Sequence, residues 1–192
     1  EAHGGGYAGW VDGDASSVAA LIEFGDAYGY ALLWHNLAAS TGAQPFYSNF
    51  WRDDPSLAFG SAWRANQNIE APLWDGIIDS VNANRAGGTP AMRLVPWLQV
   101  FMGVYDGIQS GAVTGITMAS IFSDNVHAES PVGVWLQMAT VMAVMYQRHP
   151  DQLSNAWSLE FSLSASISAG LAAQLRPIVW AACLSNPRTG LE

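Results

Sequence analysis

Apolar segments alternate along this chain with short polar stretches, and several of those stretches carry signals that start helices. Asp54, Thr89 and Ser130 each stand directly before a proline, so a capping residue is followed by one suited to the first helical position. Three such pairs predict an all-α protein. Boundaries set by these signals give about seven helices, over residues 16–39, 55–66, 72–84, 90–123, 131–148, 151–160 and 162–184. We expect them to form a compact bundle with close packing through small residues.

Two of the predicted helices contain residues that interrupt a helix. The segment 90–123 is expected to break at Pro96 or at a glycine, and the last helix to kink or restart at Pro177. The first 13 residues include three consecutive glycines and are expected to form a flexible arm. No linker long enough to divide the rest is found, so residues 14–190 are predicted to be a single helical domain.

Small residues recur at every fourth position within the segment 90–123. If this stretch is one helix, they lie along one side of it, because residues four apart are neighbours on a helix surface. Each interior glycine costs about 0.8–1.0 kcal/mol relative to alanine, so such a helix needs a partner packed close against it. We therefore predict a helix interface formed by Gly103, Gly107, Gly111, Gly115 and Ala119.

Two alternatives to a continuous helix remain open for this stretch. Asp106-Gly107 is a turn-type dipeptide, so residues 99–105 and 108–122 can form a hairpin. A helix that ends near Gly103, with another that starts after Gly115, is the second alternative.

The low content of charged residues bears on association between copies rather than on folding. Half of the 192 residues are hydrophobic, but only 12% are charged, about half the usual share. Either uncharged polar residues cover the surface, or much of it is buried against copies of the same chain. The nine tryptophans favour the second option, because aromatic residues are enriched in interface cores. We expect a homo-oligomer.

Missing residue types exclude several function classes. The chain contains no lysine, which excludes a Schiff-base or pyridoxal phosphate enzyme and the usual P-loop lysine. The net charge of −9 and the scattered arginines argue against nucleic-acid binding and against docking onto anionic lipid. The uncharged apolar stretches 107–123 and 130–147 are too short and too polar for a membrane span, so membrane contact is not favoured. No cofactor is predicted.

The lone Cys183 lies in an apolar run and is expected to be a buried, inert thiol. One cysteine excludes an intramolecular disulfide and a thiolate zinc site. The chain starts at Glu1 without a methionine. Removal of a signal peptide is one explanation and favours an extracytoplasmic or secreted location, whereas the boundary of a cloned segment is another.

Acidic residues and histidines supply the candidates for metal binding. Asp53 and Asp54 are adjacent and offer oxygen ligands to Mg²⁺ or Ca²⁺, although a cap and a favourable dipole interaction at a helix N-terminus explain them as well. His127 and Glu129, with Asp124 nearby, form a second polar group in a predicted loop. If Glu1 is the mature terminus, its amine and the His3 imidazole suit a square-planar Cu²⁺ or Ni²⁺.

A sparse set of motifs runs along the chain, with a GDAYG element at 25–29, then the pair Asp53-Asp54, then GTPAMR at 88–93. In this order they resemble the GDALG-like, TDDT and GNGAAMR-like elements of ADP-ribosylglycohydrolases, which are all-α, metal-dependent hydrolases. Arg52 and Pro55 stand where the family has threonines, and the family's late GDxDT element is absent. The resemblance implies a hydrolase with Asp53, Asp54 and Asp26 at a metal site.

Taken together, these patterns favour a self-associating protein with a structural or interaction role and without a complete catalytic constellation. Two alternatives stay open. One is a metal-dependent hydrolase of the kind just described, and the other is a membrane-active helical oligomer.

Overall fold

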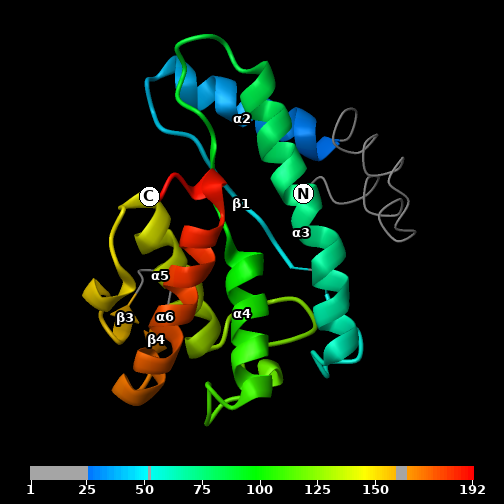
Figure 1. Cartoon of the computed structure of the whole chain (residues 1–192), viewed down its shortest axis with the longest axis vertical. Helices are drawn as coiled ribbons and strands as arrows, with labels where there is room; N and C mark the ends of the chain where they lie inside the picture. The colour runs from blue at the N-terminus through cyan, green and yellow to red at the C-terminus, as the bar shows by residue number, and fades with distance from the viewer. Residues whose placement is uncertain (1–25, 52, 159–163) are drawn as a thin grey trace. The chain divides into compact units, whose positions relative to one another are not determined.

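The computed structural model describes residues 26–51, 53–158 and 164–192 and is mostly helical (Figure 1). Its five described α-helices are α2 (Asp26–Ser40), α3 (Ser61–Asn84), α4 (Trp97–Ser110), α5 (Pro131–Met145) and α6 (Ala169–Ser185). Single 3-10 turns occur at η2 (Met118–Ser120), η3 (Pro150–Gln152) and η4 (Pro187–Thr189). The strands are β1 (Phe46–Ser48), β2 (Arg93–Val95), β3 (Ala156–Ser158) and β4 (Ser164–Ser166). A mostly helical chain is confirmed, but the described residues do not support the count of about seven helices, and two small sheets accompany the helices there.

The two short sheets fall where the sequence predicts helix or loop. Strand β1 pairs with β2, with hydrogen bonds from the Arg93 amide to Pro45 and from the Asn49 amide to Val95 that follow a parallel register. Strands β3 and β4 are antiparallel, with Ala156 opposite Ser166. The predicted helix 151–160 is therefore replaced by η3 and β3.

Helix α3 joins two segments that the sequence predicts to be separate helices. It begins at Ser61 and passes through Pro72, so neither Pro55 nor Pro72 starts a helix. A proline inside a helix removes one hydrogen bond and costs about 3 kcal/mol. Burial of Leu73, Trp74 and the residues of the next two turns offsets that cost.

The predicted helix 90–123 is divided by both kinds of residue that were expected to break it. Pro96 is the N-cap of α4, and Gly111 ends that helix in the left-handed conformation with a φ of 76°. Gly115 is also left-handed, with a φ of 82°, and Ala119 lies in η2. A continuous glycine ridge is therefore wrong, because glycine is the residue best suited to a left-handed C-cap.

Two other boundaries show how local capping works in this chain. Ser130 caps α5 by accepting a hydrogen bond from the Gly133 amide at 3.1 Å, with Pro131 at the first helical position as predicted. Helix α6 begins at Ala169 rather than at 162, because Ser168 supplies its cap to the Leu171 amide at 3.1 Å. Pro177 does not restart that helix. The described part of the first predicted helix, α2, ends at Ser40 and confirms that prediction from residue 26 onward.

The chain divides into two compact units, and each is described by itself. One comprises the described residues of Glu1–Tyr47 together with Ile69–Leu94, and the other comprises Ser48–Asn68 and Val95–Glu192. In the second unit α6 packs against both α4 and α5. Its fully buried side chains include Phe101, Trp135 and Leu175. Residues 1–13, the expected arm, lie outside the described part, and a single domain over 14–190 stays a prediction.

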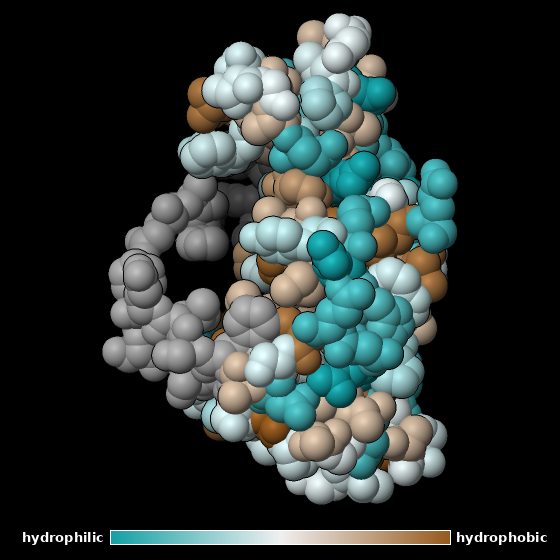
Figure 2. All heavy atoms as spheres, turned by 90° about the vertical axis from the view of Figure 1, so that its left-hand side faces the viewer, coloured by the Kyte–Doolittle hydropathy of each residue, from teal (hydrophilic) through white to brown (hydrophobic). Residues whose placement is uncertain are grey.

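Surface composition follows the low share of charged residues. On the face drawn in Figure 2, pale residues of intermediate hydropathy cover much of the surface, with teal and brown residues between them. Among the described helices, none combines the length and the hydropathy that a membrane crossing requires.

Candidate functional site

The turn that follows Trp51 is organised by the Asp54 carboxylate. One carboxylate oxygen accepts hydrogen bonds from the Ser56 amide at 3.0 Å and the Ser56 hydroxyl at 2.6 Å, and the other accepts from the Phe59 amide at 2.6 Å. Leu57 and Phe59 have φ values of 57° and 44°, which residues with side chains rarely adopt. The carboxylate therefore holds together a turn with two strained residues.

These contacts set the charge state of Asp54. Partial burial raises the pKa of this carboxyl, but the hydrogen bonds from Ser56 and from the Phe59 amide outweigh burial, so the pKa lies below its ordinary value. The ionised form is thus the one that the turn requires.

An aromatic cluster explains why the strained turn is held in place. The Phe59 ring stacks on Phe122, with ring centroids 4.1 Å apart and planes within 6° of parallel. Trp51 packs edge-on against Phe101 at 4.5 Å and against Phe122 at 5.7 Å. Trp63 lies 6.2 Å from Phe122 as well. Burial of these rings favours the turn and offsets its backbone strain.

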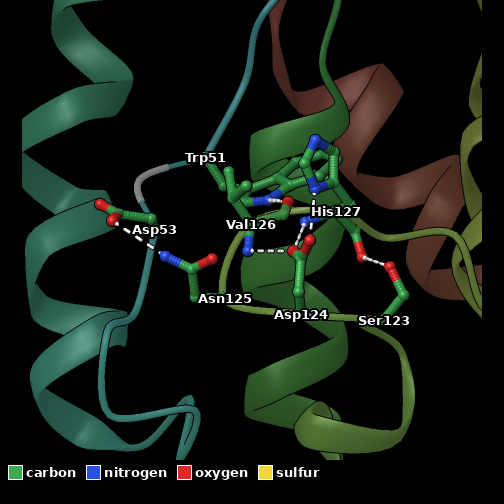
Figure 3. A network of polar contacts seen from close by, with 7 residues as sticks. All are labelled: Trp51, Asp53, Ser123, Asp124, Asn125, Val126 and His127. Carbon is green, nitrogen blue, oxygen red and sulfur yellow. Dashed lines mark hydrogen bonds and ion pairs between the residues drawn. The ribbon is translucent and has the colours of Figure 1, made fainter.

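The loop at 123–127 is built around Asp124 (Figure 3). One Asp124 oxygen accepts hydrogen bonds from the Val126 amide at 2.8 Å and the His127 amide at 2.7 Å. The other lies 2.6 Å from His127 Nδ1. The Ser123 hydroxyl donates to the His127 carbonyl at 3.0 Å rather than to the imidazole ring. The arrangement is a closed polar loop with an exposed imidazole.

Three hydrogen bonds attach this loop to Trp51, Asp53 and Asp54, and Figure 3 draws those of Trp51 and Asp53. The Trp51 indole donates to the Val126 carbonyl at 2.6 Å, and the Asp54 amide donates to the Asn125 carbonyl at 2.9 Å. The Asn125 side chain contacts the Asp53 carboxylate at 3.4 Å. The two polar groups found in the sequence, which lie about 70 residues apart, are thus brought together in one unit.

The contact between Asp124 and His127 shifts the pKa of both residues. The hydrogen bonds from the backbone and the ring of His127, with a further one from Val126, lower the pKa of Asp124 to about 2. The hydrogen bond and the charge of Asp124, with a smaller contribution from Glu129, raise the pKa of His127. Chemically, this pair keeps a proton on an exposed imidazole at a higher pH than usual.

The predicted metal ligands are not gathered into a metal site in the described part of the chain. There, no group of three or more histidine, cysteine, aspartate or glutamate residues is placed to hold an ion. Both oxygens of Asp54 already accept hydrogen bonds, and Asp53 is exposed. The side chains of Asp26 and His3 lie outside the described residues. Asp53 and Asp54 belong to one compact unit, and the other two elements of the hydrolase resemblance belong to the other.

Two of the five residues of the predicted interface lie in a close helix contact within the chain. A Cβ on Gly103 would lie 2.8 Å from Ile178 Cγ2 of α6, and one on Gly107 would lie 3.0 Å from Ile178 Cδ1 and 2.8 Å from Val113 Cγ2. Helix α6 therefore approaches α4 where side chains are missing. A Cβ at position 111 or 115 would meet open space, so the glycines there serve backbone conformation instead.

Sequence reasoning missed the surface that α2 presents. Tyr30, Leu33, Trp34 and Leu37 are between 50% and 61% exposed, and they lie on one side of the helix at i, i+3, i+4 and i+7. We call these four residues the α2 stripe. The opposite side holds Ala31 and His35, which are fully buried.

A buried histidine marks the side of α2 that faces inward. His35 Nε2 lies 2.9 Å from the Pro90 carbonyl, so the buried imidazole has a hydrogen-bond partner in the core of its unit. The large apolar residues are left outside. The sequence predicts an apolar helix here, but its two sides do not differ enough in composition to show which of them is exposed. Cys183, by contrast, is buried as predicted, and burial raises its pKa to about 12.

Comparisons with protein-family models, with curated proteins and with solved structures found no match to this chain.

Proposed function

We propose that this chain is a self-associating protein with a structural or interaction role. The observation that carries the proposal is the α2 stripe, in which four large apolar side chains stand in solvent on one side of one helix. Single exposed apolar residues are ordinary, but a contiguous apolar surface is typical of a protein interaction site. Residues 27–40 contain no aspartate, glutamate, lysine or arginine, so contact along α2 brings no like charges together although the chain has a net charge of −9.

We further propose that α4, α5 and α6 form a compact bundle that keeps the unit rigid. Contacts of α6 with both other helices support it, as does the close approach at Gly103 and Gly107. In this proposal the glycines pack helices within one copy, and the α2 stripe supplies the contact between copies.

Mass measurement by light scattering during size exclusion tests the proposal. A monomer has a mass of 20.5 kDa. We expect the mass of the wild type to rise with protein concentration, because association of exposed apolar side chains obeys mass action. Trp34→Ser should shift the mass toward the monomer. Tyr146→Ser is the matched control, since Tyr146 is 65% exposed but lies at the end of α5. A constant monomer mass, or an equal effect of both variants, refutes the proposal.

A further inference from the structure

The stripe also points to its own partner. We infer that the α2 stripe is covered by the α2 helix of a second copy, which runs antiparallel about a two-fold axis that passes between Leu33 and Trp34. This inference rests on the proposed self-association and adds the surface, the partner and the orientation.

Side-chain sizes make the stripe complementary to itself. A two-fold axis between positions 33 and 34 places Tyr30 opposite Leu37 of the second copy and brings the Leu33 and Trp34 side chains of both copies together beside the axis. Each tyrosine then meets a leucine, so a large and a small side chain face each other at both ends of the contact and the helices can interdigitate there. A parallel pair would instead place tyrosine on tyrosine and leucine on leucine, which leaves large and small side chains unmatched.

Electrostatics favour the same arrangement. Residues 27–40 contain no aspartate, glutamate, lysine or arginine, although the whole chain has a net charge of −9. Two copies therefore approach along this helix without like charges facing each other. Antiparallel helices also set the positive end of each macrodipole beside the negative end of the other, whereas parallel helices oppose like ends.

The area of the stripe sets the strength of the contact. A fully buried aromatic side chain covers roughly 150–250 Å², so the exposed half or more of Tyr30 and Trp34 contributes about 75–150 Å² each. Full burial of a leucine side chain is worth about 1.5–3 kcal/mol at roughly 25 cal/mol per Å² of apolar surface. From the area that this implies, the exposed part of each of the two leucines adds about 35–70 Å². An isologous pair then buries roughly 450–900 Å², below the 1,200 Å² of a standard interface. The contact is a reversible one that depends on concentration.

Cysteine cross-linking of the full chain tests the surface and the orientation together. The native Cys183 is buried and does not compete for oxidation while the protein is folded. Leu33→Cys lies next to the axis, where two copies are offset by only about 1.5 Å along the helices. Two copies of Tyr30→Cys are offset by about 10.5 Å at 1.5 Å per residue. A disulfide requires Cα atoms within about 7 Å.

The expected pattern under mild oxidation has three parts. Leu33→Cys forms a covalent dimer. Tyr30→Cys and Leu37→Cys, each alone, do not. A mixture of Tyr30→Cys and Leu37→Cys forms a heterodimer, because these positions face each other across the antiparallel pair. All three residues are exposed, so the variants should keep the far-ultraviolet circular dichroism of the wild type.

Each other outcome overturns the inference in a recognisable way. Self-cross-linking of Tyr30→Cys as efficient as that of Leu33→Cys indicates a parallel or nonspecific contact. A wild type whose mass rises with concentration, without cross-links in any variant, associates through another surface, so the inference fails and the proposed function stands. A wild type that stays monomeric, with a Trp34→Ser variant of lower melting temperature, has its stripe covered within one chain, and both fail.

Discussion

The first turn of α5 leaves no space for a side chain at Gly133. A Cβ at this position would lie 2.5 Å from the Ala128 carbonyl oxygen and 2.7 Å from the Ile121 carbonyl oxygen. Close carbon–oxygen contacts in proteins are about 3.3 Å or longer, so Gly133→Ala requires backbone shifts of roughly 0.6–0.8 Å. Both obstacles are backbone atoms, which do not rotate away as the end of a flexible side chain does.

The magnitude follows from two opposing effects. Alanine is better than glycine inside a helix by at most about 1 kcal/mol. Overpacking typically costs about 1–3 kcal/mol, and movement of the Ala128 carbonyl also strains its 2.8 Å hydrogen bond from Gln137, worth about 0.5–1.5 kcal/mol. We expect Gly133→Ala to be less stable than the wild type by about 1–3 kcal/mol. For a chain of this size that corresponds to a melting temperature lower by roughly 2–12 °C.

Gly170→Ala is a closely matched control. Gly170 lies in the first turn of α6 behind the serine cap Ser168, as Gly133 lies in the first turn of α5 behind Ser130, but nothing lies within 4 Å of its Cβ position. Gly170→Ala should match or exceed the wild type by up to about 1 kcal/mol. Urea unfolding, followed by circular dichroism and tryptophan fluorescence, compares the two variants. A Gly133→Ala protein as stable as Gly170→Ala would refute the packing described for α5.

Three further predictions concern titratable groups. The lowered pKa of Asp54 means that its ionised form stabilises the fold above the unfolded-state pKa and that this stability is lost as the pH falls through the folded value. Asp54→Asn should therefore lower the urea midpoint at pH 7, and the loss should shrink as the pH is lowered stepwise through the acidic range. An equal loss at every pH contradicts the role of the charge. In Asp124→Asn the raised pKa of His127 should return toward 6.5 in an NMR titration, and an unchanged value would show that the ion pair is absent in solution. Cys183, with a pKa of about 12, should resist thiol reagents in the folded protein and react in urea, whereas fast labelling of the native chain would show that it is accessible.

Local signals in the sequence predict the parts of this fold that neighbouring residues determine. The Ser130-Pro131 pair starts a helix because the cap and its amide partner are three residues apart. Pro96 and Gly111 bound α4 through local effects as well, since proline lacks the amide hydrogen that a residue inside a helix donates and glycine readily adopts the left-handed cap. The mostly helical character of the chain follows from such signals.

The candidate site shows where local signals stop. Asp54-Pro55 has the composition of a helix start, but the carboxylate braces a turn because Phe59 stacks on Phe122 and the Asp54 amide bonds to Asn125. Those partners are more than 60 residues away. No local pattern distinguishes the two uses of one capping residue.

The glycines and helix α2 also show that local sequence signals do not determine which residues meet in space. Glycines four apart look alike in the sequence, but Gly107 is placed against Ile178 and Gly111 is placed at a helix end. The sequence by itself determined that α2 is an apolar helix. Only the tertiary structure decided that Ala31 and His35 turn inward, with the imidazole hydrogen-bonded to the Pro90 carbonyl, and that the α2 stripe turns outward. Spacing along a chain specifies which residues share a side of a helix, and contacts between distant segments specify which side is buried.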